Sequence, residues 1–141
     1  MNRRIATVLV ALILLGAVTG WAADYQVIVH STNPTDTITR EQLGKMFLKK
    51  IQKWENGTSV LPVDQMPASP ARAAFTRVVH GKAVSAIASY WQQQVFAGRD
   101  VPPAEKAGDA AVLAFVKANP GAIGYVSGAV AVDGVKLLTI R

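Results

Sequence analysis

The sequence predicts a single α/β domain in which helices cover a central sheet. Short segments rich in β-branched residues alternate with longer segments whose apolar residues recur at helical spacing, and the connections between them are too short to form a second domain. The chain has 141 residues, of which 50% are hydrophobic. That length suits one globular domain and is too short for two full ones.

The first 22 residues are predicted to be a signal peptide. Met1-Asn2-Arg3-Arg4 is a basic start, residues 5–20 form an uncharged apolar run, and Gly20-Trp21-Ala22 offers small residues to a signal peptidase, so cleavage is expected before Ala23. An uncleaved membrane anchor is the alternative, but the run is short for a bilayer span of about 20 residues. We therefore expect a domain over residues 23–141 in a periplasmic or secreted protein.

The charge of the domain points away from nucleic acid and membrane partners. Without Arg3 and Arg4, 13 Lys and Arg residues stand against 9 Asp and Glu residues, a net charge of +4. The only basic cluster has helical spacing, which is typical of a solvated face; it comprises Lys45, Lys49, Lys50 and Lys53. The absence of cysteine excludes disulfides, thiolate metal sites and a cysteine nucleophile.

The first half of the domain is predicted to contain two strands and two helices. A strand over residues 25–30 precedes a helix that Thr39 opens with a capping box. A turn over residues 54–58 leads into a second strand over residues 60–63. The second helix begins at Ser69 and stops at Gly81-Lys82.

The second half is predicted to add two helices and one or two strands. A helix over residues 84–97 faces inward with Ile87, Tyr90, Trp91 and Val95, and Gly98 ends it. After an exposed loop over residues 99–106, Asp109 caps a short helix, and a strand over residues 122–126 follows, where Gly124 suggests that another backbone or a ligand passes close by. Residues 130–140 are either a hairpin turning at Asp133-Gly134 or a loop feeding one last strand.

These elements are expected to share one hydrophobic core, because a chain of this size supports only one. Its predicted members lie on the apolar faces of their elements: Phe47, Phe75, Trp91, Val116 and Ile123.

The start of the helix at Ser69 is the candidate functional site. Ser69 is a predicted N-cap and Pro70 suits the first helical position, while the free backbone N–H groups of the first turn, including that of Ala71, face the preceding loop. An oxyanion could be held there by these amides, the Ser69 hydroxyl and Arg72. The alternative interpretation, an ordinary capped helix start that binds no ligand, fits the same residues equally well.

Two charged residues belong to this site. Arg72 is unusual, because a cation in a first helical turn opposes the helix dipole unless an anion lies between them, so Arg72→Ala is expected to cost little stability. Asp64 either orients a protonated oxyanion or pairs with Arg72, and the ion pair is the favoured interpretation.

Other chemistry is not supported by the sequence. His30 and His80 are the only histidines and neither has a second ligand at metal spacing, so no metal site is expected; His80 is interpreted as a cation near helix C-terminal carbonyls. Four aromatic residues are expected to be buried or half-buried in the core and not to form a ligand-stacking cage: Trp54, Tyr90, Trp91 and Tyr125. Without a nucleophile or an acid–base pair, neither an enzyme nor a cofactor is expected.

Four motifs are distributed in order along residues 38–126 of the domain: Ile38–Phe47, Lys50–Trp54, Ser69–Phe75 and Asn119–Val126. Together they resemble the phosphate-binding proteins of ABC transporters, in the type 2 periplasmic-binding superfamily. The resemblance implies a single lobe of a type 2 periplasmic-binding fold, with a central sheet flanked by helices, and inorganic phosphate or a similar oxyanion as the ligand.

The resemblance also shows where this sequence departs from the family. The family's helix usually starts Ser-Gly-Thr-Arg and its Ser, Thr and backbone amides bind phosphate, so Ser69 and Arg72 carry over, whereas Pro70 replaces Gly and Ala71 replaces Thr. An amide donor and a hydroxyl are therefore lost, and the family's other lobe has no counterpart here.

These departures predict weak or vestigial anion binding, with Ser69, Ala71, Arg72 and Asp64 as the candidate residues. The alternative is an interaction module whose former cleft face docks another envelope protein or a second copy of this chain. A dry apolar face would favour the alternative, and a wet face lined by N–H groups would favour anion binding.

Overall fold

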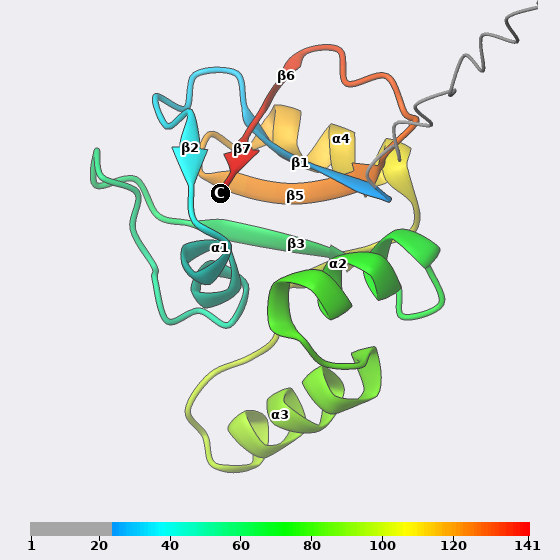
Figure 1. Cartoon of the computed structure of the whole chain (residues 1–141). Helices are drawn as coiled ribbons and strands as arrows, with labels where there is room; N and C mark the ends of the chain where they lie inside the picture. Colours follow the sequence, from blue (N-terminus) through cyan, green and yellow to red (C-terminus); the bar gives the residue numbers. More distant parts are fainter. Residues whose placement is uncertain (1–23) are drawn as a thin grey trace, which may run out of the picture.

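A computed structural model describes residues 24–141, in which helices cover both faces of a five-stranded sheet (Figure 1). The strands of this sheet are β1 (Tyr25–His30), β3 (Leu61–Gln65), β4 (Ala104–Lys106), β5 (Ala122–Ser127) and β6 (Val135–Leu137), in the order β4-β3-β5-β1-β6. β3 is parallel to β4 and β5, and β1 is antiparallel to β5 and β6. β2 (Thr37–Ile38) and β7 (Thr139–Ile140) form a separate parallel pair. The predicted signal peptide lies outside the described residues.

The four helices begin and end close to the positions that local sequence predicts. They are α1 (Arg40–Phe47), α2 (Pro70–His80), α3 (Val84–Phe96) and α4 (Asp109–Ala118). At α1 the capping box is complete, because Thr39 Oγ1 accepts from Gln42 N at 3.1 Å and Gln42 Oε1 accepts from Thr39 N at 2.8 Å. α2 begins after Ser69 and ends at Gly81, whose φ of 64° is left-handed. The mixed α/β fold class is confirmed.

The expectation of one core is wrong, because the central sheet separates two hydrophobic clusters. The larger cluster lies on the side of α1 and α2 and includes Phe47, Phe75 and Ile123; the smaller lies on the side of α4 and includes Val116. Side chains on a strand alternate between the two faces, so neighbours in β5 enter different clusters. Trp91 is buried but belongs to neither cluster.

Two predicted details near the sheet are corrected and one open alternative is decided. The loop over residues 99–106 contains β4, which pairs with β3. Of the two alternatives for residues 130–140, the loop that feeds a final strand is found, since β6 pairs with β1 and there is no hairpin at Asp133-Gly134. At Gly124 the close neighbours are side chains, since an added Cβ would lie 2.7 Å from Val63 Cγ1 and 2.9 Å from Val112 Cγ1.

Three predicted details of the helices are also corrected. The N-cap of α4 is Gly108, with φ 85°, and Asp109 is its first helical residue. Val95 faces outward on α3 and is 51% exposed. His80 is no cation at neutral pH, because its burial, assisted by the charge of Lys82, lowers its pKa to about 4.

Two searches of residues 24–141 bear on membrane and metal partners. None of the described helices combines the length and apolarity that crossing a bilayer requires. The same residues contain no group of three or more His, Asp and Glu side chains placed to hold a metal ion.

Candidate functional site

A pocket of about 430 Å³ lies where α2 and α4 both begin, at the C-terminal end of β3. Its lining comes from these three elements and the end of β5: Gln65, Met66, Ser69, Pro70, Ala107, Gly108, Asp109 and Ser127. The first-turn N–H groups of a helix have no intrahelical acceptor, and the dipole makes that end positive. Two helix N-termini at one pocket are a favourable setting for an anion.

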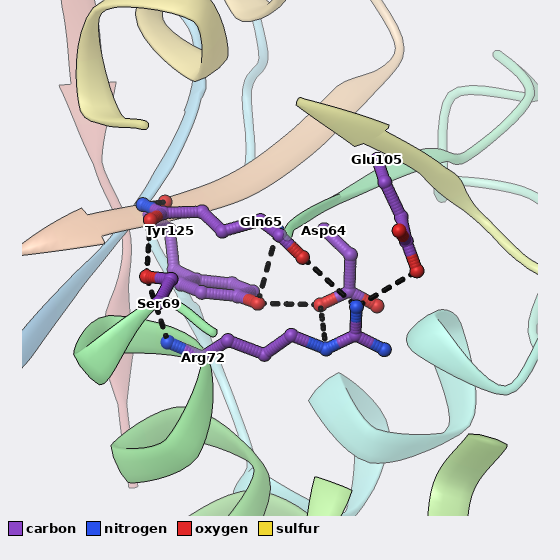
Figure 2. Close-up of polar contacts among 6 residues, drawn as sticks. All are labelled: Asp64, Gln65, Ser69, Arg72, Glu105 and Tyr125. Carbon is purple, nitrogen blue, oxygen red and sulfur yellow. Dashed lines mark hydrogen bonds and ion pairs between the residues drawn. The ribbon is translucent and has the colours of Figure 1, made fainter. Parts of the chain in front are cut away.

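Gln65 joins the starts of the two helices, α2 through Ser69 and α4 through Asp109. Figure 2 shows its bond to Ser69. Its side chain is at the centre of the site and only 2% of the residue is exposed. Oε1 accepts from Ser69 Oγ at 2.6 Å, and Nε2 donates to Asp109 Oδ1 at 2.7 Å and to the Tyr125 carbonyl oxygen at 3.1 Å. The side-chain amide therefore links the starts of α2 and α4, and both its oxygen and its nitrogen are occupied by these bonds.

Ser69 is the N-cap that the sequence predicts, and its hydroxyl is already engaged. Oγ accepts from Arg72 N at 3.4 Å and gives its proton to Gln65. A ligand at the pocket would gain this proton only if the bond to Gln65 broke. Ala71 lies in the same first turn with its side chain buried, so the group it can offer is its backbone N–H.

Arg72 extends away from Ser69 into a buried polar network, where its guanidinium meets two carboxylates (Figure 2). Nη1 donates to the Gln65 carbonyl oxygen at 2.9 Å and to Glu105 Oε1 at 2.8 Å, and Nε lies 3.8 Å from Asp64 Oδ1. The favoured interpretation of Asp64 and Arg72 as an ion pair is confirmed.

The expected tolerance of Arg72→Ala is therefore corrected. Arg72 is 4% exposed and is the cation that faces both Asp64 and Glu105. Removing one partner from a buried ion pair leaves an uncompensated charge. Arg72 and Asp64 do not line the pocket; Arg72 is linked to it through the backbone carbonyl of Gln65.

Tyr125 connects Asp64 and Gln65 within the buried polar network. Its hydroxyl donates to Asp64 Oδ1 at 2.5 Å and accepts from Gln65 N at 3.1 Å. Its ring stacks on Phe75, with centroids 4.1 Å apart and planes 10° apart. The polar network is thus anchored directly in the larger hydrophobic cluster.

The pKa values in this network follow from burial and charge. Burial raises the pKa of Asp64, and the neighbouring Arg72 and the Tyr125 hydroxyl offset only part of that effect. Burial alone would lower the pKa of Arg72, but Asp64 and Glu105 raise it overall, so Arg72 stays charged. Burial and the Asp64 carboxylate together raise the pKa of Tyr125. In the Asp64–Arg72 pair, burial therefore disfavours the charged form of Asp64, whereas the charged form of Arg72 is favoured overall.

Asp109 places a carboxylate at the pocket itself. Its Oδ1 accepts from Ser127 N at 2.9 Å as well as from Gln65. Burial would raise the pKa of Asp109, but these hydrogen bonds lower it overall, so the group is ionised at neutral pH. The pocket therefore combines two positive helix ends with one fixed negative charge.

Sequence reasoning missed four members of the site: Gln65, Glu105, Asp109 and Tyr125. The sequence did offer a signal for Gln65, because this residue comes just after the predicted strand over residues 60–63 and lies four residues before the N-cap of α2. The convergence of α2 and α4 could be predicted only from the sheet order. α2 follows β3 and α4 follows β4, and the C-terminal ends of these neighbouring parallel strands lie at the same edge of the sheet.

Among comparisons with known proteins, only those with solved structures found similar proteins. No protein-family model matches the chain, and no curated protein matches it. A structure from Clostridium perfringens, assigned to the phosphate ABC transporter substrate-binding proteins and determined with bound phosphate, is 22% identical with a TM-score of 0.67. An ABC-type phosphate transport receptor from Vibrio cholerae is 20% identical (TM-score 0.64), and PstS from Borrelia burgdorferi is 14% identical (TM-score 0.65).

These similarities establish a periplasmic-binding fold. The three alignments cover 83%, 83% and 84% of this chain, but 44%, 46% and 47% of the similar structures. The chain thus spans less than half of their length, as expected of a single lobe.

Proposed function

We propose that this protein is an exported, single-lobe oxyanion-binding protein with weak or vestigial affinity. The observation that carries this proposal is the convergence of the α2 and α4 N-termini on one pocket at the end of the parallel strands. A phosphate or similar oxyanion would accept hydrogen bonds from the first-turn amides, including that of Ala71, and from Ser69. Arg72 and Asp64 would not touch the anion and would hold Gln65 and the start of α2 in place.

Weak affinity follows from what the pocket cannot offer. Pro70 has no N–H, the Ser69 proton is bound to Gln65, and both amide protons of Gln65 have acceptors. Arg72 is occupied by Asp64, Glu105 and the Gln65 carbonyl. We therefore expect a dissociation constant no lower than roughly 1 mM, which corresponds to about 4 kcal/mol.

Asp109 supports selectivity for an oxyanion that carries a proton. Its ionised carboxylate at the pocket repels a fully deprotonated anion but can accept a hydrogen bond from hydrogen phosphate. Sulfate has no proton to donate at neutral pH. Phosphate should therefore bind more tightly than sulfate.

The proposal of binding rather than catalysis draws on the similar structures, which are named as a substrate-binding protein and a transport receptor. A second candidate function is docking of another envelope protein, or of a second copy, on the pocket face. It is supported by the internal pairing of the side chains of Gln65, Ser69 and Asp109, and by Met66, which is 45% exposed at the rim. A partner bound there would cover the pocket.

Export is proposed from the basic start and apolar run of residues 1–22. The intact mass of the protein recovered from the cell envelope should correspond to a chain that begins at Ala23. A species that retains Met1 and sediments with membranes would replace the signal peptide by an anchor.

Calorimetric titration of the mature protein with phosphate and sulfate tests the binding proposal. Weak heats at millimolar phosphate, and weaker ones with sulfate, are expected. Micromolar affinity would contradict a weak site and would mean that another group or a second copy completes it.

A further inference from the structure

A second pocket lies at the opposite end of β3 from the pocket at α2 and α4. Its volume is about 350 Å³, and it is lined by side chains from residues 46–53, 59–62 and 100–104 and by Phe115. These residues belong to the end of α1 and the loop after it, the start of β3, the start of β4 and one position of α4. α1 lies beside β3 in this part of the fold (Figure 1). We call this cavity the α1 pocket; its volume is in the range of pockets that bind small molecules.

The basic cluster of the sequence divides at the α1 pocket. Lys49 and Lys53 line the pocket. Lys45 instead pairs with Glu41 on the surface of α1 at 3.0 Å, and Lys50 is exposed and is not part of the lining. Two cations from one short segment are therefore directed to the same cavity.

Both of these lysines keep N–H groups that a ligand could use. Lys53 Nζ donates to Ser59 Oγ at 2.9 Å, which occupies one of the three donors of an ammonium group. The Lys49 side chain is only 24% exposed, and Asp100 Oδ1 lies 3.9 Å from its Nζ, too far for a hydrogen bond. Two lysines and one aspartate give the lining a net charge of +1.

The backbone of Lys49 adopts a conformation that suits glycine. Its φ is 57°, and among residues 24–141 it is the one residue other than glycine with a positive φ. Its N–H donates to the Met46 carbonyl oxygen at 3.1 Å and the following N–H donates to that of Lys45 at 2.8 Å, which are the two bonds of a Schellman motif. Glycine is the usual residue at this position of the motif. A strained residue is expected where its side chain serves a function.

The rest of the lining favours a ligand with an apolar body. Met46, Leu61 and Phe115 contribute large apolar side chains to the α1 pocket. A small inorganic anion would leave these side chains uncovered, and the Asp100 carboxylate disfavours a second negative charge. An organic monocarboxylate matches both parts of the lining, because its charge can pair with the lysines while its body covers the apolar side chains.

We propose that the α1 pocket binds small organic carboxylates that carry an aromatic or aliphatic body. The carboxylate accepts hydrogen bonds from Lys49 and Lys53, and the body packs against Phe115. This site lies at the other end of β3 from the starts of α2 and α4, so it goes beyond the proposed oxyanion site and does not depend on it.

Chemical-shift titration of the mature chain with benzoate and hexanoate tests the ligand class. Both should shift the backbone amides of residues 49–53 and 100–104. Acetate lacks the apolar body and benzamide lacks the charge, so each should bind roughly tenfold more weakly than benzoate, or weaker still. No shifts at these residues with either carboxylate at tens of millimolar, or equal binding of benzamide and benzoate, would overturn the proposal.

Lys49→Gly tests the role of the strained residue. It should weaken benzoate binding by roughly tenfold or more and should raise the urea midpoint, because glycine adopts a positive φ without steric cost. Lys50→Gly is the matched control: it removes the same charge from the next position, which has no positive φ and does not line the pocket. Binding should be unchanged in this control and its midpoint should not rise. Unchanged binding in Lys49→Gly, or an equal loss in Lys50→Gly, would overturn the proposal.

Discussion

The Ser69 hydroxyl donates its proton to the side-chain carbonyl of Gln65 across 2.6 Å. Gln65 in turn donates to Asp109, so the caps and first turns of α2 and α4 are bound to each other through one buried amide. The same bonds that hold the pocket in shape occupy the groups that would bind an anion. Rigidity and weak affinity therefore have a common origin in this site.

The buried network predicts a large loss of stability for Arg72→Ala. The variant leaves Asp64 and Glu105 without their cation, which should cost about 3–5 kcal/mol of unfolding free energy. Arg77→Ala, on the exposed side of α2, should cost less than about 0.5 kcal/mol. Urea melts of the two variants measure the difference, and equal midpoints would mean that Arg72 is not part of a buried pair.

Asp64→Asn should be better tolerated than Arg72→Ala. Burial disfavours the Asp64 carboxylate, and an asparagine can still accept from the Tyr125 hydroxyl while Arg72 keeps Glu105. We expect a cost below about 1 kcal/mol in the same melts. A cost as large as that of Arg72→Ala would show that the carboxylate itself stabilises the fold.

Restoring a lost donor should strengthen anion binding. Pro70→Gly returns an amide N–H to the first turn of α2. A hydrogen bond to a charged group contributes about 1.5–3 kcal/mol, so this variant should bind phosphate at least tenfold more tightly. Ala71→Ser is the control, because its hydroxyl would enter the larger hydrophobic cluster and not the pocket, so the affinity should not change. Unchanged affinity in Pro70→Gly would place the anion elsewhere.

His80 should make stability fall at mildly acidic pH. Its pKa is about 4 in the folded protein against 6.5 when unperturbed, so the unfolded chain takes up the proton first. This contribution is present in full above about pH 6.5 and is lost as the pH falls towards 4. His80→Gln should flatten the decline of unfolding free energy over that window, and an unchanged slope would mean that His80 is charged in the fold.

The two hydrophobic clusters should respond independently to truncation. Phe75→Ala should cost about 3–5 kcal/mol. Val116 lies on the other side of the sheet, so the cost of Val116→Ala should add to that of Phe75→Ala within about 0.5 kcal/mol in denaturant melts. Phe47 contacts the Phe75 ring at a centroid distance of 4.7 Å, so Phe47→Ala and Phe75→Ala should not be additive.

Features that depend on neighbours in sequence could be predicted, and features that depend on sheet order could not. The caps at Thr39 and Ser69 are local, and both helices begin where the sequence indicates. β4 was missed because its three residues become a strand only by pairing with β3. Gln65 and Asp109 meet across 44 positions of sequence, so their bond could not be inferred from spacing.

Chemical-shift titration of the isotope-labelled mature protein with phosphate tests the weak anion site most directly, because it detects millimolar binding and locates it. We expect fast-exchange shifts of the backbone amides at Ala71, Arg72 and residues 108–110, with a dissociation constant no lower than roughly 1 mM and smaller shifts with sulfate. Shifts confined to other surfaces, or none at tens of millimolar phosphate, would contradict an anion site at the starts of α2 and α4.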